Sequence, residues 1–383
     1  MDDGKRGELL ALALVFSLST CVRALPELLV PSCPVGYDSP LYAFLMSHLD
    51  EVSPAYLFRM GPVLYVLGWL SYELTGASPY ILVKIMAPVL YGLLISSLFL
   101  FLRRGLRWPL RKSLLGALIC LFQPLSLRLS WDLLRNELGM AFFFLYLSLA
   151  REAGRKPLKA LLSLLTCLSH PIAAFLLVLA QLPEALKAVR GKLEDRTSVI
   201  LPLFSFSLLL AQAILIFLVG GPPLRDRDII WIGNPLGGGT LFYNYFTDYR
   251  FLGYSYLDFV LSVARLLAVS LLPALPLGLA GLLNSRRTGL PAGFRAVAVW
   301  LLAAILTAFV VPQHYPFYRF WRWGVLLVFP VSVYAADFLW GIRRQAIRNR
   351  VSVLFLAVSV AVGLDYAIGL APLFQDWVVM SYM

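Results

Sequence analysis

A few charged residues in an otherwise apolar chain could do chemistry. Asp38 stands in Gly36-Tyr37-Asp38-Ser39-Pro40, shortly after the first long apolar run. A carboxylate where a chain leaves a membrane suits a general base that takes a proton from a hydroxyl group. The same residue also suits a helix start, because an aspartate accepts amide hydrogen bonds and Pro40 fits the first turn. We favour the catalytic interpretation and keep the capping one as its alternative.

A second polar group lies in Ser130-Trp131-Asp132-Leu133-Leu134-Arg135-Asn136-Glu137. Asp132 and Glu137 are candidates for binding an acceptor or a metal ion, and Arg135 is a candidate for contacting a phosphate. Asp132 and Arg135 are three residues apart, so a helix would place them on one face. They could instead form a pair in an exposed turn, which would contribute about 0–1 kcal/mol. The pattern favours neither interpretation.

Basic residues that could bind an anion recur near the predicted external ends of the apolar runs. Arg319 and Arg322 lie close together in an aromatic segment and could clamp a phosphate. They could also anchor an aromatic belt at a membrane surface. His170, which precedes Pro171, and Arg59 join them as candidates for binding a donor phosphate. The alternative for His170 is a polar helix end.

The composition predicts an all-α membrane protein with many passes. Of the 383 residues, 60% are hydrophobic and 14% are charged, and the mean hydropathy is +0.79. A water-soluble core could not bury so much apolar surface. Apolar runs near the roughly 20 residues needed for a span, with one short pair at 158–182, predict about eleven transmembrane helices. The other runs are 9–25, 80–102, 113–128, 136–150, 198–219, 256–283, 296–311, 324–341 and 351–370.

The net charge of +12 indicates topology and not a nucleic-acid partner. About two thirds of the 33 lysines and arginines fall in six loop clusters, which the positive-inside rule assigns to the cytoplasm. The N-terminus is then cytoplasmic, the C-terminus is external, and the protein resides in the cell membrane. Lys84 and Arg265 are exceptions that fall inside apolar runs.

The external loops carry their own predicted elements. Residues 36–79 must lie outside, and Leu41–Asp50 and Arg59–Leu74 resemble two helices lying in the interface. The stretch 158–182 must cross and return as two helices of about 12 residues, with its turn at Ser169-His170-Pro171. Each would reach only about 18 Å. Backbone at that depth implies a cavity open to the external face.

Several other classes of site lack their signatures. The four cysteines show no CxxC spacing, so neither a disulfide framework nor a zinc site is indicated. A divalent metal such as Mg²⁺ or Mn²⁺ is left open, because Asp38, Asp132, Glu137 and His170 offer suitable ligands. Gly237-Gly238-Gly239 lacks the pattern of a nucleotide-binding loop. It lies in an external aromatic loop, 221–255, which suits either sugar binding or an interfacial belt.

Together these features resemble the membrane-embedded GT-C glycosyltransferases, which include protein O-mannosyltransferases and the lipid A aminoarabinose transferase. Gly36-Tyr37-Asp38 is similar to the acidic motif of their first external loop, and Arg59-Met60-Gly61-Pro62 to the start of their second interfacial helix. Asp132 with Asn136-Glu137 is similar to their acidic second loop, and Arg319–Trp323 is reminiscent of archaeal members. The resemblance covers roughly residues 8–220. A pair of acids at Asp38, a WWD-type motif and a large soluble C-terminal domain are missing.

The resemblance implies a GT-C-like catalytic module at 1–220 and a variable C-terminal transmembrane region at 221–383. It further implies inverting transfer of a sugar from a polyprenyl-phosphate (dolichyl-type) donor to a lipid, glycan or protein acceptor on the external face. Asp38 would be the base, and the donor phosphate would meet Arg319, Arg322, His170, Arg59 and Arg135. A secondary transporter is one alternative. A polysaccharide polymerase or ligase is another, and it would use arginines such as Arg225, Arg227 and Arg250.

Overall fold

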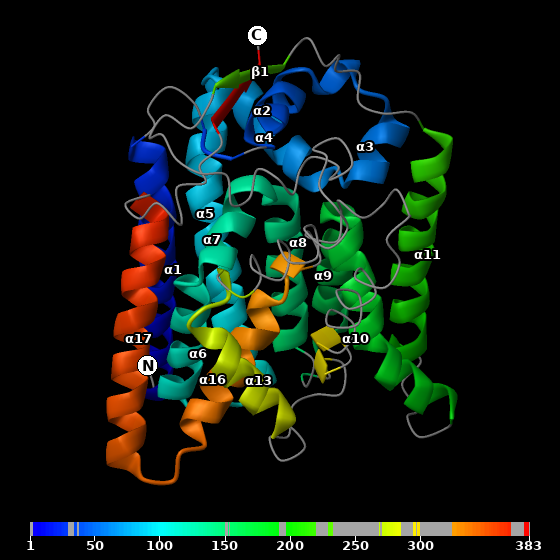
Figure 1. Ribbon diagram of the computed structural model, residues 1–383. Coiled ribbons are helices and arrows are strands. Elements are labelled where there is room, and N and C mark those ends of the chain that lie inside the picture. The colour runs from blue at the N-terminus through cyan, green and yellow to red at the C-terminus, as the bar shows by residue number, and fades with distance from the viewer. Residues whose placement is uncertain are drawn as a thin grey trace, which may run out of the picture.

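The computed structural model describes residues 3–29, 34–36, 38–149, 152, 154–190, 197–219, 229–232, 268, 270–284, 294–295, 297–298, 324–368 and 379–382. Over this part of the chain, long helices form a bundle, and shorter helices lie across one end of it (Figure 1). Arg319, Arg322 and most of the loop 221–255 lie outside the described residues.

Four of the described helices are long and apolar enough to cross a membrane. They are α1 (Asp3–Leu29), α5 (Pro79–Leu100, continued by the π-helical turn η2, Phe101–Gly105), α10 (Pro171–Val189) and α17 (Gln345–Ile368). The helices α6 (Leu110–Leu121) and α7 (Pro124–Asp132) would form a fifth span if taken together, with a bend of 63° between them. These candidate spans support the expected multi-pass membrane architecture, whereas the total of about eleven passes stays a prediction.

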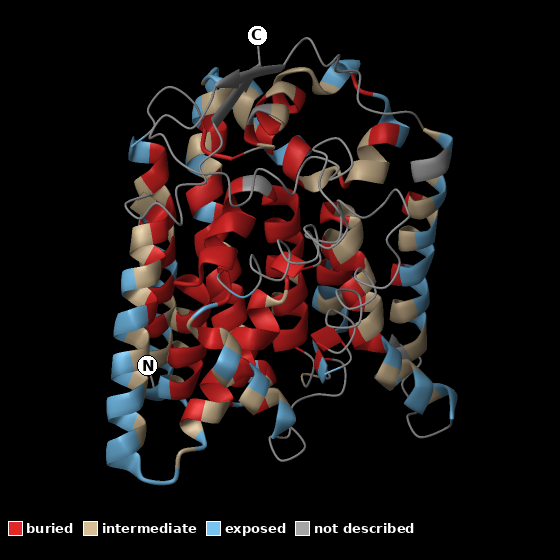
Figure 2. Cartoon of the chain, viewed as in Figure 1, coloured by how far each residue is buried: buried red, intermediate tan, exposed pale blue. Residues whose placement is uncertain are grey.

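The buried centre of the bundle is formed by α5, α6, α7 and α8 (Leu134–Ser148), as Figure 2 shows. Nearly every side chain of α8 is buried. By contrast, α1, α17 and α11 (Thr197–Leu218) expose apolar side chains such as Leu14, Leu354 and Ile214. Exposed apolar side chains along helices of this length fit a lipid environment. The helices α13 (Ala274–Leu283) and α16 (Val328–Trp340) pack against each other and complete the described bundle.

The first loop folds into more helices than the sequence indicated. It contains α2 (Ser39–Ser47), the 3-10 turn η1 (Leu49–Glu51), α3 (Pro54–Met60) and α4 (Val63–Thr75), and these elements cover one end of the bundle (Figure 1). The predicted helix from Arg59 to Leu74 is present as α4, but it begins only at Val63, because Gly61 adopts a φ of +91° that ends α3. Arg59 therefore belongs to the last turn of α3 and does not begin the next helix.

The predicted helix break at His170 is confirmed. The helix α9 (Lys156–Ser169) ends there and α10 begins at Pro171. The expected length of about 12 residues was too short, because the two helices have 14 and 19 residues and reach about 21 and 28 Å. The second helix continues to Val189, into a segment that the charge pattern assigned to a cytoplasmic loop.

A short ribbon joins two distant parts of the chain. Strand β1 (Ile229–Ile232) pairs antiparallel with β2 (Val379–Tyr382), so that Ile229 lies opposite Tyr382. The ribbon lies at the end of the bundle that α2 covers, whereas α1 begins at the opposite end (Figure 1). This arrangement places the two ends of the described chain on opposite sides of the bundle.

Candidate functional site

The segment that carries Asp38 is held against the end of α7. Gly36 has a φ of +128°, and a Cβ atom there would lie 1.8 Å from the carbonyl oxygen of Trp131. The Ser39 hydroxyl lies 3.1 Å from the same carbonyl oxygen and can donate its proton to it. Because Asp132 follows Trp131 directly as the last residue of α7, the chain segments carrying Asp38 and Asp132 are neighbours. The side chain of Asp132 lies outside the described part of the structure.

Asp38 occupies the N-cap position of α2, but its side chain makes no capping hydrogen bond. Its φ and ψ of −86° and −6° are helical, whereas a capping residue is typically extended. The half-buried carboxylate instead lies within electrostatic range of Arg135. Ser53 makes a useful contrast, because its hydroxyl does cap α3 by accepting from the Tyr56 amide at 3.2 Å.

Arg135 lies in the first turn of α8 and is only 6% exposed. Its guanidinium donates to the Met60 carbonyl oxygen at the end of α3 and to the Tyr42 hydroxyl. It also lies over the Tyr65 ring, 5.5 Å from the centroid. The exposed turn, one of the two interpretations that the sequence left open, is therefore wrong at Arg135, and the nearby Arg128 is also buried (1% exposed). The bundle buries the turn beneath the first-loop helices.

Arg59 and Tyr56 contact each other on α3. The Arg59 guanidinium lies 4.7 Å from the centre of the Tyr56 ring and donates to the Val219 carbonyl oxygen at 2.6 Å, just beyond the end of α11. Burial raises the pKa of the Tyr56 phenol, against the opposing effect of the charges on Arg135 and Arg59. The phenol therefore stays protonated near neutral pH and can donate a hydrogen bond. It is unsuited to act as a base there.

His170 lies at the junction between α9 and α10. It caps α10, because its Nδ1 atom accepts from the Ile172 amide at 3.1 Å. A neutral ring that accepts through Nδ1 carries its proton on Nε2. A Cβ atom at Gly61 would lie 2.3 Å from the Ser169 carbonyl oxygen, so the turn after Met60 packs directly on the residue before His170. The predicted alternative, a polar helix end, is confirmed for the Nδ1 atom.

Glu137 lies deeper in the bundle than the sequence indicated. Its side chain is fully buried, and within the described part of the chain neither carboxylate oxygen has a hydrogen-bond partner. Arg23 of α1 lies within electrostatic range of it. The exposed turn, which the sequence left open as an alternative for this segment, is therefore wrong at Glu137, and the acceptor or metal role stays a prediction.

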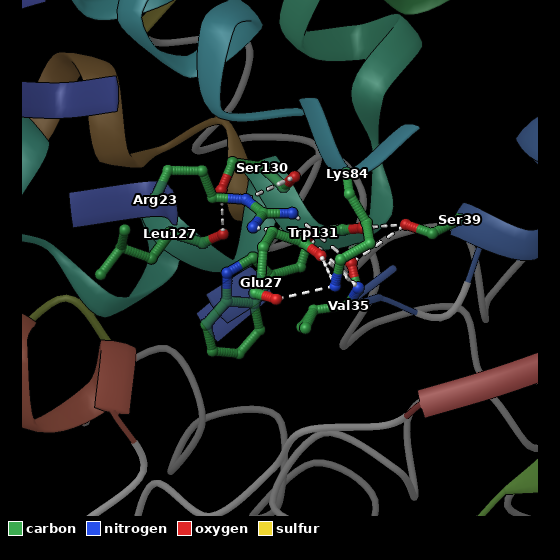
Figure 3. Close-up of polar contacts among 8 residues, drawn as sticks. All are labelled: Arg23, Glu27, Val35, Ser39, Lys84, Leu127, Ser130 and Trp131. Carbon is green, nitrogen blue, oxygen red and sulfur yellow. Dashed lines mark hydrogen bonds and ion pairs between the residues drawn. The ribbon is translucent and has the colours of Figure 1, made fainter. Parts of the chain in front are cut away.

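A network of buried charges in α1 and α5 was not predicted from the sequence. Arg23 and Glu27 form an ion pair at 2.8 Å with side chains 0% and 5% exposed, and Lys84 approaches the second Glu27 oxygen at 3.2 Å (Figure 3). Lys84 also donates to the Glu27 main-chain carbonyl oxygen at 2.7 Å, one of the carbonyls that lack a partner at a helix end. The signal was available, because Arg23 and Glu27 are four residues apart in an apolar helix and Lys84 interrupts an apolar run.

The network binds the chain just before Asp38. Both Glu27 carboxylate oxygens accept from the Val35 amide, at 3.2 and 3.1 Å, and Arg23 donates to the Val35 and Ser130 carbonyl oxygens at 3.5 and 3.2 Å. In Figure 3, Arg23 and Glu27 of α1 meet the Val35 backbone, Lys84 of α5 meets Glu27, and Arg23 also reaches Ser130 of α7. Removing one partner of a buried ion pair commonly costs 3–5 kcal/mol. The network is therefore a strong local constraint.

No known protein family matches this sequence, and no curated protein does either. The chemistry of the site rests on its own residues. They provide a carboxylate at Asp38, a cation at Arg135 and the hydroxyl groups of Tyr42, Tyr56 and Tyr65. Among the described residues, no three His, Cys, Asp or Glu side chains gather closely enough to hold a metal ion. A carboxylate near a cation and several hydroxyl groups suits the removal of a proton from a bound hydroxyl group, with an anion bound beside it.

Proposed function

We propose that the protein is a membrane glycosyltransferase that moves a sugar from a polyprenyl-phosphate donor to an acceptor hydroxyl on the external face. The observation that carries the proposal is the state of Asp38. It stands where a capping residue would, makes no capping bond, and lies beside Arg135 at the bundle end that α2, α3 and α4 cover. A carboxylate within electrostatic range of a buried cation suits a base that removes a proton beside an anion.

The reaction would proceed by a single displacement. The Asp38 carboxylate takes the proton of the acceptor hydroxyl, and the acceptor oxygen forms a bond to the anomeric carbon. The bond from that carbon to the phosphate oxygen breaks on the opposite face, and its electron pair leaves with the polyprenyl phosphate. The configuration at the anomeric carbon is inverted.

Cations around the carboxylate would stabilise the charge that develops on the departing phosphate. Arg135 is the described cation best placed for this, because it already lies within electrostatic range of Asp38. Arg59 lies in the last turn of α3, and His170 is the N-cap residue of α10. Arg319 and Arg322 would join them from the last large turn. Part of Arg59 is already bonded to Val219, so its role would be shared between structure and binding.

The buried charges of α1 and α5 favour one alternative, a secondary transporter, because ionisable residues inside helical bundles often mark transport paths. In this protein Arg23 and Glu27 bind the Val35 backbone. Side chains that are hydrogen-bonded to the backbone in this way suit a structural role better than an ion-transport path. The transporter therefore ranks below the enzyme.

The decisive experiment uses the purified protein in lipid nanodiscs with a panel of polyprenyl-phosphate monosaccharides, hexoses and pentoses alike. Release of free polyprenyl phosphate, dependent on an added hydroxyl acceptor, is the expected result. The Asp38→Asn variant is the matched control for contaminating activity. If no donor is consumed and proteoliposomes instead accumulate a labelled solute, the transporter is correct.

A further inference from the structure

The Asp38 segment is held at Val35 by a charged group formed by Arg23, Glu27 and Lys84. The Val35 amide and carbonyl are bonded to Glu27 and Arg23 respectively. The Ser39 hydroxyl also lies 3.0 Å from the Val35 carbonyl oxygen. The backbone between Val35 and Ser39 is therefore fixed at both ends, and Asp38 lies between them.

The group carries more positive than negative charge. Two cations, Arg23 and Lys84, meet one carboxylate, and each of the three side chains also binds main-chain atoms. Glu27 uses both of its oxygens on Val35 and on the two cations. A group so extensively bonded within the protein has little remaining capacity to bind a substrate, so its role is to hold the chain.

We propose that Glu27, oriented by Arg23 and Lys84, is a positioning residue that sets the place of the Asp38 carboxylate relative to α7 and α8. This inference rests on the proposed function for its kinetic consequences, although the contact to Val35 does not. Glu27 acts through the backbone and touches no reacting atom. A shift of a base by about 1 Å can cost on the order of 100-fold in rate.

A second buried ion pair in the protein provides a matched control. Lys112 and Asp337 form a second buried ion pair, with a distance of 2.5 Å, between α6 and α16. Glu27→Gln and Asp337→Asn make the same chemical change, a carboxylate to an amide of nearly equal size, in two buried pairs. Only the first pair binds the Asp38 segment.

The test combines hydrogen exchange with kinetics on the full-length protein in nanodiscs. In Glu27→Gln we expect the amides of the peptide covering 34–39 to exchange at least ~10-fold faster, because the Val35 amide loses a charged acceptor. We expect kcat for transfer to fall at least ~10-fold, with the KM for the donor changed less than about twofold. In Asp337→Asn we expect a lower Tm, with exchange at 34–39 and kcat unchanged.

Native exchange at 34–39 in Glu27→Gln would overturn the inference, and so would equal effects of the two variants on exchange and kcat. If Glu27→Gln does not fold, Lys84→Gln is the second variant, because Lys84 is the most exposed member of the network at 17%. It should show the same changes in smaller measure, and native exchange there would also overturn the inference. The exchange arm needs no substrate, so a failure of the positioning role is distinguishable from a failure of the proposed function, which would appear as no transfer by the unaltered protein.

Discussion

The Ser39 hydroxyl lies 3.1 Å from the Trp131 carbonyl oxygen, across 92 residues of sequence. One residue before Ser39 is Asp38, and one residue after Trp131 is Asp132. A single contact therefore brings together the two segments that carry the acidic candidates. The contact depends on Gly36, because a side chain there would occupy the space of the same carbonyl oxygen.

Gly36→Ala should disrupt this contact severely. The new Cβ atom would lie 1.8 Å from the Trp131 carbonyl oxygen, and the backbone φ of +128° is one that alanine rarely adopts. Strain and displacement of this kind should cost on the order of 3 kcal/mol. Thermal unfolding in detergent measures the loss. Gly154→Ala is the control, because a Cβ atom there meets nothing within 4 Å, and an equal Tm for both variants would contradict the docking.

Asp38→Asn separates catalysis from capping. Asparagine keeps the size of the aspartate side chain and ranks beside it as a helix N-cap, so the substitution should preserve the fold while lowering turnover by a factor on the order of 100 to 10,000. Ser53→Ala is the opposite control, since Ser53 does cap α3. It should cost about 0.5–2 kcal/mol of stability with turnover per folded molecule retained. Transfer at the normal rate by a well-folded Asp38→Asn protein would remove Asp38 as the base.

The sequence predicted the positions of the helices more accurately than the contacts between them. The apolar runs at 9–25, 80–102 and 351–370 correspond to α1, α5 and α17, because composition and length alone decide whether a helix suits a bilayer. Pro171 marked the start of α10 for a local reason, its missing amide proton. Helix ends were harder to place. The polar residues Asp3 to Glu8 continue α1, and Glu8 pairs there with Arg103 and Arg104.

The candidate site was predictable only in part, because its bonds join residues far apart in the sequence. The Arg135 contact to Met60 spans 75 residues, and that of Lys84 to Glu27 spans 57. Whether such partners meet depends on which helices pack together and how each is rotated, which no local pattern encodes. The burial of Glu137 follows from the same packing. Its neighbours in the sequence suggested a wet turn, and its neighbours in space are other helices.

Arg319 and Arg322 should bind the donor phosphate if the clamp prediction from the sequence is correct. Hydrogen bonds to a charged group contribute about 1.5–3 kcal/mol, so each change to Ala should weaken donor binding at least ~10-fold. Equilibrium binding of a polyprenyl-phosphate sugar to the purified protein measures the effect. Arg155→Ala is the control, because Arg155 is 53% exposed and pairs only with the nearby Glu152 among the described contacts. Unchanged affinity in both single variants and the double variant would rule out the clamp.

The predicted orientation in the membrane can be tested at the two ends of α5. With the turn η2 this helix has 27 residues, so it extends about 40 Å and separates Ser78 from Arg107 by a full membrane thickness. Both residues are exposed, and Arg107 lies near Arg103 and Arg104, which contact Glu8 of the N-terminal helix. In a chain whose native cysteines are replaced, an impermeant thiol reagent added to intact cells should label Ser78→Cys and leave Arg107→Cys unlabelled.

Permeabilised cells provide the control for this experiment, since the reagent should then label both positions and show that each thiol reacts when it is reached. Basic residues are retained on the cytoplasmic side of a membrane, and the Arg103–Lys112 cluster lies at the same end of α5 as Arg107. Labelling of Arg107→Cys in intact cells, with Ser78→Cys protected, would show that the orientation in the membrane is the opposite of the predicted one. Asp38 would then face the cytoplasm, where a donor carried on the outer leaflet could not reach it.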